Sequence, residues 1–197
     1  MTGEVSRLAA CAAAAALAIA ATVLQGCVPV IVAGAAGATM IAVDRRSTGA
    51  QVDDQAIEVK VESEAGTRWA NDIHLNVTSY NGNVLLTGEA PNAQVRSEIE
   101  KITRDSHDRV RKIYNEMVIG PVTDLGARSN DSYITSKVKT RMIDSESVRS
   151  IYSKVVTERS VVYLMGIVSR KDGDAAAQVA ATTEGVARVV KLFEYTD

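Results

Sequence analysis

The side chains that could do chemistry are few, and their spacing does not build an enzyme site. The 197 residues include two cysteines, Cys11 and Cys27, and two histidines, His74 and His107. No His/Cys cluster has metal-ligand spacing, no nucleophile sits in a strand-to-helix elbow, and no glycine-rich loop follows a strand to cradle phosphate. We therefore predict a protein that is not an enzyme and has no cofactor. Both histidines are expected on the surface.

Cys27 is the residue whose surroundings indicate a specific reaction. It follows an uncharged, alanine-rich run at 8–25, which comes after a short start containing Arg7. A charged start, an apolar stretch and small residues before a cut site define a secretory signal. Leu24-Gln25-Gly26-Cys27 resembles the lipobox of bacterial lipoproteins. In that family the cysteine thiol takes a diacylglycerol, the peptide is cut before it, and the new amino terminus is acylated, with palmitate as a common chain.

Membrane anchoring follows from the number of acyl chains. One chain binds a membrane only marginally, whereas two or more hold stably at about 0.8 kcal/mol per buried CH₂. Residue 28 is Val rather than Asp, and by the sorting rule of enteric lipoproteins this resemblance implies the outer membrane. We predict a lipid-anchored, periplasm-facing protein with a signal peptide at 1–26. The alternatives are an ordinary cleaved signal with a chance cysteine, or an uncleaved anchor.

Composition limits the partners and the sources of stability. Residues 27–52 are interpreted as the lipidated N-terminus and tether, because the uncharged part at 28–43 is shorter than the roughly 20 apolar residues of a membrane span. The formal net charge is −2 and stays there after cleavage, because Glu4 and Arg7 leave together. There is thus no bulk electrostatic case for nucleic acid. With Cys27 acylated, no thiol remains for a disulfide, so aliphatic cores must stabilise the fold.

The rest of the chain repeats itself with an offset near 77 residues, which indicates a duplicated domain. Segment 76–88 aligns with 154–166, and Asp54 aligns with Asp131. We predict an α+β fold of two tandem domains, each αββαβ with a three-stranded mixed sheet and two helices. Each copy is near the lower size limit for a self-sufficient core, so the two are expected to pack together. The predicted boundaries are 53–120 for the first domain, 121–129 for a linker, and 130–197 for the second.

Periodicity and turn chemistry give the order of elements in one copy. Ile57, Val61 and Ala65 recur at the spacing of one helical face. Asn81-Gly82 suits the positive φ angles of a tight hairpin turn, whereas the second copy has Arg159-Ser160 there and lacks this signal. The predicted elements are a helix started by Asp53-Asp54, strands at 73–80 and 83–88, a helix opened by Pro91-Asn92, a closing strand at 110–119, and Asn130 or Asp131 as N-cap of the next helix.

Ordered blocks of sequence resemble a known family. They are Asp44-Arg45-Arg46-Ser47, Gln51-Val52-Asp53-Asp54, Asn76-Val77-Thr78, Val84-Leu85-Leu86-Thr87-Gly88, Tyr114-Asn115-Glu116 and Ser129-Asn130-Asp131. Together with the lipobox they resemble the dual BON-domain outer-membrane lipoproteins of Gram-negative bacteria. The resemblance implies two BON domains and binding of an anionic phospholipid membrane by the second. It also implies a role in outer-membrane integrity and a link to outer-membrane protein assembly machinery and division-site components.

Charge and periodicity favour the first helix of the second copy as the lipid-binding element. Residues 132–143 carry a net charge of +3, whereas the equivalent helix at 53–64 carries −4. Basic residues near an anionic surface add about 1 kcal/mol each, and exposed aromatic rings suit the headgroup boundary. The family's lipid-contacting helix falls on this segment, with Trp in place of Tyr133 in some members, and Gly126 matches a family position near the site. The predicted phospholipid-binding residues are Gly126, Tyr133, Ser136, Lys137, Lys139, Thr140 and Ile143.

Other interpretations of these residues stay open. Basic residues outside a helix are usually just solvated, and Tyr133 and Ile143 could pack against the first domain. The main rival function is a protein-docking module, in which the acidic first domain binds an outer-membrane assembly or division factor. A peptidoglycan-linked lipoprotein is a third class, but the sequence lacks a long polar tether or wall-binding motif.

Overall fold

The computed structural model describes residues 44–148 and 151–197, and all of them fall in one compact unit. The predicted signal peptide at 1–26, the acylated Cys27 and the tether up to residue 43 lie outside the described residues. Among the helices that are described, none has the length and apolar character needed to cross a membrane.

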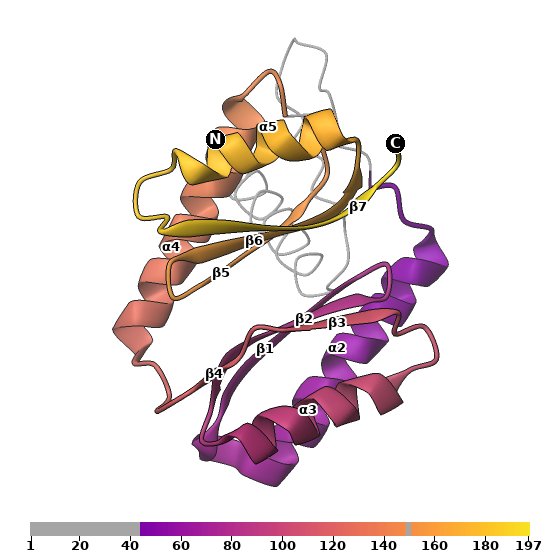
Figure 1. Cartoon of the computed structure of the whole chain (residues 1–197), viewed down its shortest axis with the longest axis vertical. Coiled ribbons are helices and arrows are strands. Elements are labelled where there is room, and N and C mark those ends of the chain that lie inside the picture. Colours follow the sequence, from indigo (N-terminus) through magenta and orange to yellow (C-terminus); the bar gives the residue numbers. More distant parts are fainter. Residues whose placement is uncertain (1–43, 149–150) are drawn as a thin grey trace, which may run out of the picture. The chain divides into compact units, whose positions relative to one another are not determined.

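Both copies have the predicted αββαβ order (Figure 1). In each, a central strand pairs antiparallel with the strand before it and parallel with the strand that closes the copy. The α+β prediction of two mixed sheets with two helices each is therefore confirmed within the described residues. The first copy contains α2 (Thr48–Trp69), a 3₁₀ turn η1 (Ala70–Asp72), β1 (His74–Tyr80), β2 (Asn83–Ala90), α3 (Ala93–Ser106), β3 (Lys112–Asn115) and β4 (Val118–Ile119). The second contains α4 (Leu125–Asp144), β5 (Lys154–Glu158), β6 (Val161–Val168), α5 (Arg170–Ala181) and β7 (Arg188–Tyr195).

The closing strand predicted at 110–119 is in fact two short strands. Both β3 and β4 pair in parallel with β2. Between them the Asn115 side chain accepts a hydrogen bond from the Met117 backbone N–H at 3.4 Å, and the Met117 side chain is buried. The turn at Asn115 therefore interrupts the pairing with β2, and it places the Met117 side chain in the core.

Helix α2 begins at Thr48, with Ser47 as its N-cap, so the predicted start at Asp53-Asp54 was wrong and the last residues of the predicted tether are helical.

Helix α4 also begins earlier than predicted. Asp124 is the N-cap, and its carboxylate accepts a hydrogen bond from the Ala127 N–H at 3.0 Å. Residues 125–129, which were assigned to the linker, are therefore helical, and the prediction of Asn130 or Asp131 as N-cap was wrong. Asp131 lies inside the helix, and its side chain accepts hydrogen bonds from the turn at Arg159-Ser160 instead of capping the helix.

Each copy uses one buried aspartate to hold its hairpin turn. Asp54 on α2 accepts hydrogen bonds from both backbone N–H groups of Asn81-Gly82, at 2.7 and 2.9 Å. Asp131 on α4 accepts the equivalent bonds from Arg159-Ser160, at 2.8 and 2.9 Å. All four turn residues have positive φ. The second hairpin thus has the same two-residue geometry as the first without the Asn-Gly signal, and a carboxylate from the helix supplies the missing support.

The two central strands, β2 and β6, are buried on both faces. One face of each sheet packs under its own pair of helices, and the other faces meet between the two sheets (Figure 1). This explains why β6 reads as a nearly continuous apolar run, and why Val84, Leu85 and Leu86 of β2 are apolar in succession rather than in alternation. The cluster between the sheets consists of Tyr80, Leu85, Tyr163, Met165 and Leu192.

The short segment before α2, residues 44–47, is held by an ion pair to the same buried aspartate, Asp54. The guanidinium of Arg46 donates to Asp54 and to Asp44, each at 2.8 Å, and lies 4.1 Å from the centre of the Tyr80 ring. Burial alone would raise the pKa of Asp54, but hydrogen bonds from Ser79, Gly82 and Arg46 outweigh it and hold that pKa below its usual range.

Replacing Asp54 with Ala should destabilise the protein by about 3–5 kcal/mol, because Arg46 would remain buried without its partner and the turn would lose two acceptors. Chemical denaturation measures this loss. Asp53→Ala is the matched control, since Asp53 makes only partly exposed ion pairs with Arg109 and His107 and should change stability by less than about 1 kcal/mol. Equal effects of the two substitutions would contradict the role of Asp54.

Acid should weaken the fold through the same group. When the pKa of a carboxyl is lower in the folded protein than its ordinary value, which is 3.8 for aspartate, the carboxylate stabilises the fold at any pH above that ordinary pKa. This contribution is lost as the pH falls through the lower pKa of the folded state. The free energy of unfolding should therefore fall below about pH 4. In Asp54→Asn this loss should be shallower, as measured by urea unfolding at a series of pH values; identical slopes would exclude Asp54 as a contributor.

Candidate functional site

The predicted phospholipid-binding residues lie together on the outer side of α4. Tyr133 and Ile143 are 62% and 68% exposed, so neither is packed away against the first domain. Lys137 is half-buried, and the remaining predicted residues, Gly126, Ser136, Lys139 and Thr140, are exposed. The opposite stripe of α4, formed by Ile134, Val138 and Met142, is buried as the periodicity predicted.

Leu125 extends this face and was missed by the sequence analysis. Its side chain is 73% exposed and precedes Ile143 by five full helical turns, so the two point in nearly the same direction. The outer face of α4 therefore offers apolar groups at both ends, about 27 Å apart, with Tyr133 between them. The helical spacing between Leu125 and Ile143 was present in the sequence, but the assignment of residue 125 to a linker concealed it.

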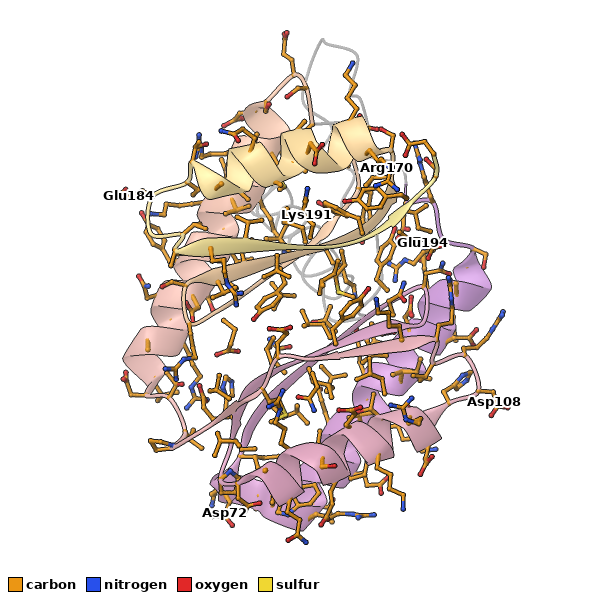
Figure 2. All side chains as sticks on the ribbon, viewed as in Figure 1. Asp72, Asp108, Arg170, Glu184, Lys191 and Glu194 are labelled. Atoms are coloured by element: carbon orange, nitrogen blue, oxygen red, sulfur yellow. The ribbon has the colours of Figure 1, made fainter. Side chains whose placement is uncertain are left out.

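A surface hollow of about 520 Å³ lies between α4 and the loop that follows α5. On its helix side the ammonium of Lys137 lies 4.8 Å from the centre of the Tyr133 ring and 3.6 Å from the carboxylate of Glu184. Glu184 is almost fully exposed in that loop, where Figure 2 labels it. Such a weakly held ammonium beside threonine and serine hydroxyls can donate hydrogen bonds to a phosphate oxygen. The lining residues are Tyr133, Ser136, Lys137, Thr140, Arg141, Thr182, Thr183 and Glu184.

Two basic residues of α4, Arg141 and Lys139, differ in their contacts. Arg141 joins α4 to the end of α5, because its guanidinium donates to the hydroxyl of Thr183 at 2.8 Å and to that of Thr182 at 3.1 Å. Lys139 is exposed and has no ion pair among the described residues. Lys139 is thus free to meet an external anion, whereas Arg141 is structural.

The acids of α2 are used largely inside the molecule. Strand β1 lies at a sheet edge, and its outward backbone N–H groups need acceptors. Glu58 accepts from the Ser79 N–H at 2.8 Å, and Glu62 accepts from the Val77 N–H at 3.2 Å. Two of the five acidic residues at 53–64 therefore cover the edge of the sheet.

His74 is not the surface residue that the sequence analysis expected. Its ring is only 19% exposed and its Nδ1 lies 3.2 Å from the carboxylate of Glu89 and 3.9 Å from that of Glu158. Glu89 is the cross-strand neighbour of His74, and Glu158 ends β5 in the other copy. No spacing rule for a single element could have found this group, because packing of the two copies brings it together.

Two αββαβ units follow one another, and the second carries an exposed helix face that is both basic and apolar. The chain belongs to the BON domain family, which matches residues 53–121 and 130–197. These two ranges correspond to the two copies that the structure describes.

Two curated relatives match most of the chain, and a third matches less than half of it. The chain is 36% identical over 176 residues to the "Outer membrane lipoprotein DolP" of Haemophilus influenzae, a match that covers 88% of this chain and 91% of that protein. It is 37% identical over 155 residues to the "21 kDa hemolysin" of Actinobacillus pleuropneumoniae, covering 78% of this chain and 79% of the relative. A shorter match, 35% over 83 residues, is to the "Osmotically-inducible protein Y" of Escherichia coli, covering 42% of this chain and 41% of that protein.

Because Arg141 bonds to the end of α5 and Lys139 does not, we expect their substitutions to affect stability differently. Arg141→Ala should lower the free energy of unfolding by about 1–2 kcal/mol, since it removes charged hydrogen bonds to the end of α5. Lys139→Ala should change it by no more than about 0.5 kcal/mol. Thermal or urea unfolding of the two variants measures this difference, and a destabilised Lys139→Ala would show that Lys139 also has a structural partner.

Proposed function

We propose that this BON-domain protein is an outer-membrane lipoprotein, anchored through Cys27, whose second domain binds anionic phospholipid and supports outer-membrane integrity. The observation that carries the proposal is the outer face of α4, where large apolar side chains are exposed beside Lys137, which has one long ion pair, and Lys139, which has none within the described part of the chain. The name of the Haemophilus relative supports the location, and the lipobox pattern supports the anchor.

The chemistry of the face suits a membrane surface better than water. Leu125, Tyr133 and Ile143 can each remove apolar area from water by entering the headgroup boundary, a gain of about 25 cal/mol per Å² buried. Lys137 and Lys139 flank this stripe and would each add about 1 kcal/mol near an anionic leaflet. The anchor raises the local concentration of lipid around α4, so a weak site suffices.

The rival function is docking of a protein factor for outer-membrane assembly or division. A separate observation favours it, because α2 exposes Val52 and Val59 (63% and 57%) on the first domain, away from α4. In this alternative the vesicle surface is irrelevant and the domains meet a folded partner. The two functions make opposite predictions for lipid vesicles.

Residues 44–197, without the anchor, should co-sediment with phosphatidylglycerol-rich vesicles, and less so as salt screens the lysines. Tyr133→Glu and Ile143→Glu should each weaken this binding roughly tenfold or more, since they place an anion where apolar area met the lipid. The matched control is Val59→Glu, which makes the same change at a similarly exposed valine on α2 and should bind like the parent.

Circular dichroism spectra and melting temperatures of the three variants establish that each is folded. Binding that is equal for anionic and zwitterionic vesicles, or unchanged by both α4 substitutions, would reject α4 as the phospholipid site. Absence of vesicle binding altogether would favour the docking module and leave Cys27 as the membrane contact.

A further inference from the structure

Three side chains of metal-ligand type converge where the two BON domains meet. The ring of His74, on β1, and the carboxylates of Glu89 and Glu158 each offer one ligand atom, and these atoms all lie within 4.8 Å of one another. Two of the three come from the first domain and Glu158 comes from the second. The cluster is inside the molecule: Glu89 is fully buried and the Glu158 side chain is 7% exposed.

One atom of this cluster lacks the partner that burial demands. Oε1 of Glu158 is buried and has no hydrogen-bond partner among the described residues, yet it is the atom that faces His74, at 3.9 Å. A buried carboxylate oxygen without a partner is costly. Burial, together with the nearby charges of Glu89 and Asp131, raises the pKa of Glu158 despite the opposing effects of His74 and of the nearby Thr87 hydroxyl, whose oxygen is also buried without a hydrogen-bond partner among the described residues.

We propose that His74, Glu89 and Glu158 bind one divalent transition-metal ion, with Zn²⁺ as the best fit, and that the ion ties the two BON domains together. One imidazole nitrogen and two carboxylate oxygens are ligands that Zn²⁺ accepts at about 2.0–2.2 Å, commonly with water in the fourth position. The two carboxylates would neutralise the charge of the ion, and the ion would supply the missing partner of Glu158.

The present distances require little movement. Ligand atoms around a tetrahedral Zn²⁺ are about 3.3–3.6 Å apart, given the bond lengths above. The Nδ1 atom of His74 is already 3.2 Å from Glu89 and 3.9 Å from Glu158, and the three ligand atoms lie within 4.8 Å of one another. The two carboxylates therefore have to approach each other by no more than about 1.5 Å.

Neighbouring groups fix the orientation of Glu89 as a ligand. Its carboxylate accepts hydrogen bonds from the Thr123 backbone N–H, at 3.1 Å, and from the Thr123 hydroxyl. Arg159 lies 3.5 Å from its Oε1 atom, whereas Oε2 is the oxygen next to His74. Outer partners of this kind hold ligating carboxylates in place, although the charge of Arg159 itself opposes a cation.

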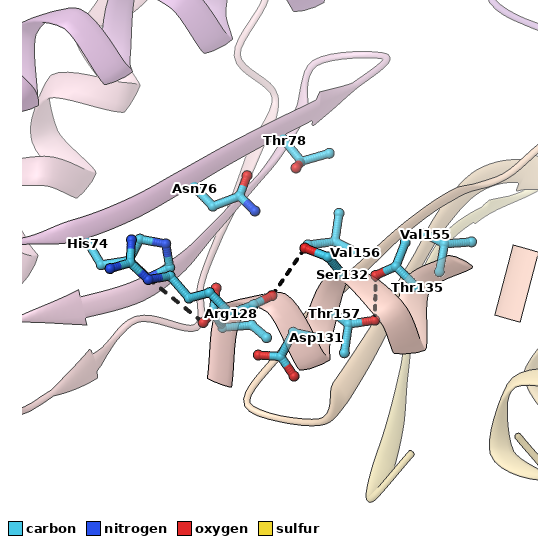
Figure 3. A pocket seen from close by; sticks show the side chains of 11 residues that line it. His74, Asn76, Thr78, Arg128, Asp131, Ser132, Thr135, Val155, Val156 and Thr157 are labelled. Carbon is cyan, nitrogen blue, oxygen red and sulfur yellow. Dashed lines mark hydrogen bonds and ion pairs between the residues drawn. The ribbon is translucent and has the colours of Figure 1, made fainter. Parts of the chain in front are cut away.

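Solvent can reach the cluster from one side. A polar cleft of about 300 Å³ is lined by His74 and Glu158, with Arg128 and Asp131 on α4. Figure 3 shows His74 on its strand facing the start of α4 across this cleft. The cleft provides an entry path for the ion and room for a water ligand.

The test is Zn²⁺ binding to the full chain in detergent micelles, after treatment with EDTA and dialysis, measured by isothermal titration calorimetry. The parent protein should bind one ion per chain, and His74→Ala and Glu158→Gln should each weaken that site by about a hundredfold or more. His107→Ala is the matched control, because it removes the other histidine and should leave the affinity unchanged. Any contribution of the cysteines is common to all four proteins.

Thermal unfolding supplies a second readout. Zn²⁺ should raise the melting temperature of the parent, since the ion binds the folded state, but not that of Glu158→Gln. Without metal, Glu158→Gln should be at least as stable as the parent, because it replaces a buried charged side chain with a neutral one of the same size and shape. The proposal is overturned if no stoichiometric site is found at micromolar Zn²⁺, or if His107→Ala weakens the site as much as His74→Ala. Vesicle binding by α4 is measured separately and does not depend on either result.

Discussion

The buried aspartate of each first helix is the interaction on which both BON domains depend. A hairpin turn with two residues at positive φ leaves two backbone N–H groups pointing inward, and a helix packed on the same sheet must satisfy them. Asp54 and Asp131 do so with the same pair of hydrogen bonds. This contact fixes the helix against the hairpin, and with it the side of the helix that faces water.

The arrangement of layers follows from the two doubly buried strands. Because β2 and β6 bury both faces, each sheet needs a partner on the side that its own helices do not cover, and the other sheet provides it. Sheet-to-sheet packing keeps all four described helices at the outside (Figure 1). Within the described residues, the same packing that stabilises the core therefore leaves the apolar side chains on the outer face of α4 exposed.

Much of this could be predicted from the sequence, and the failures have physical causes. The duplication, the strand order and the inward stripes followed from local periodicity, because Ile57, Val61 and Ala65 repeat at helical spacing. The turn at Arg159-Ser160 gave no local signal because its stability comes from Asp131, a residue distant in sequence. The start of α4 was missed because its cap, Asp124, lay in a segment assigned to a linker. His74 was misplaced because its environment is tertiary, with carboxylates from two other strands.

The fastening of Arg46 has a mechanical consequence. If the proposed anchor at Cys27 holds the protein to a bilayer, a pull on that anchor enters the described part of the chain at Asp44. There the load passes through the Arg46 guanidinium to Asp54 and the Tyr80 ring, and the stacked Tyr152 of the second domain lies beside them. Tension would thus be borne by a charged network at the seam of the two domains, rather than by peeling α2 from its end.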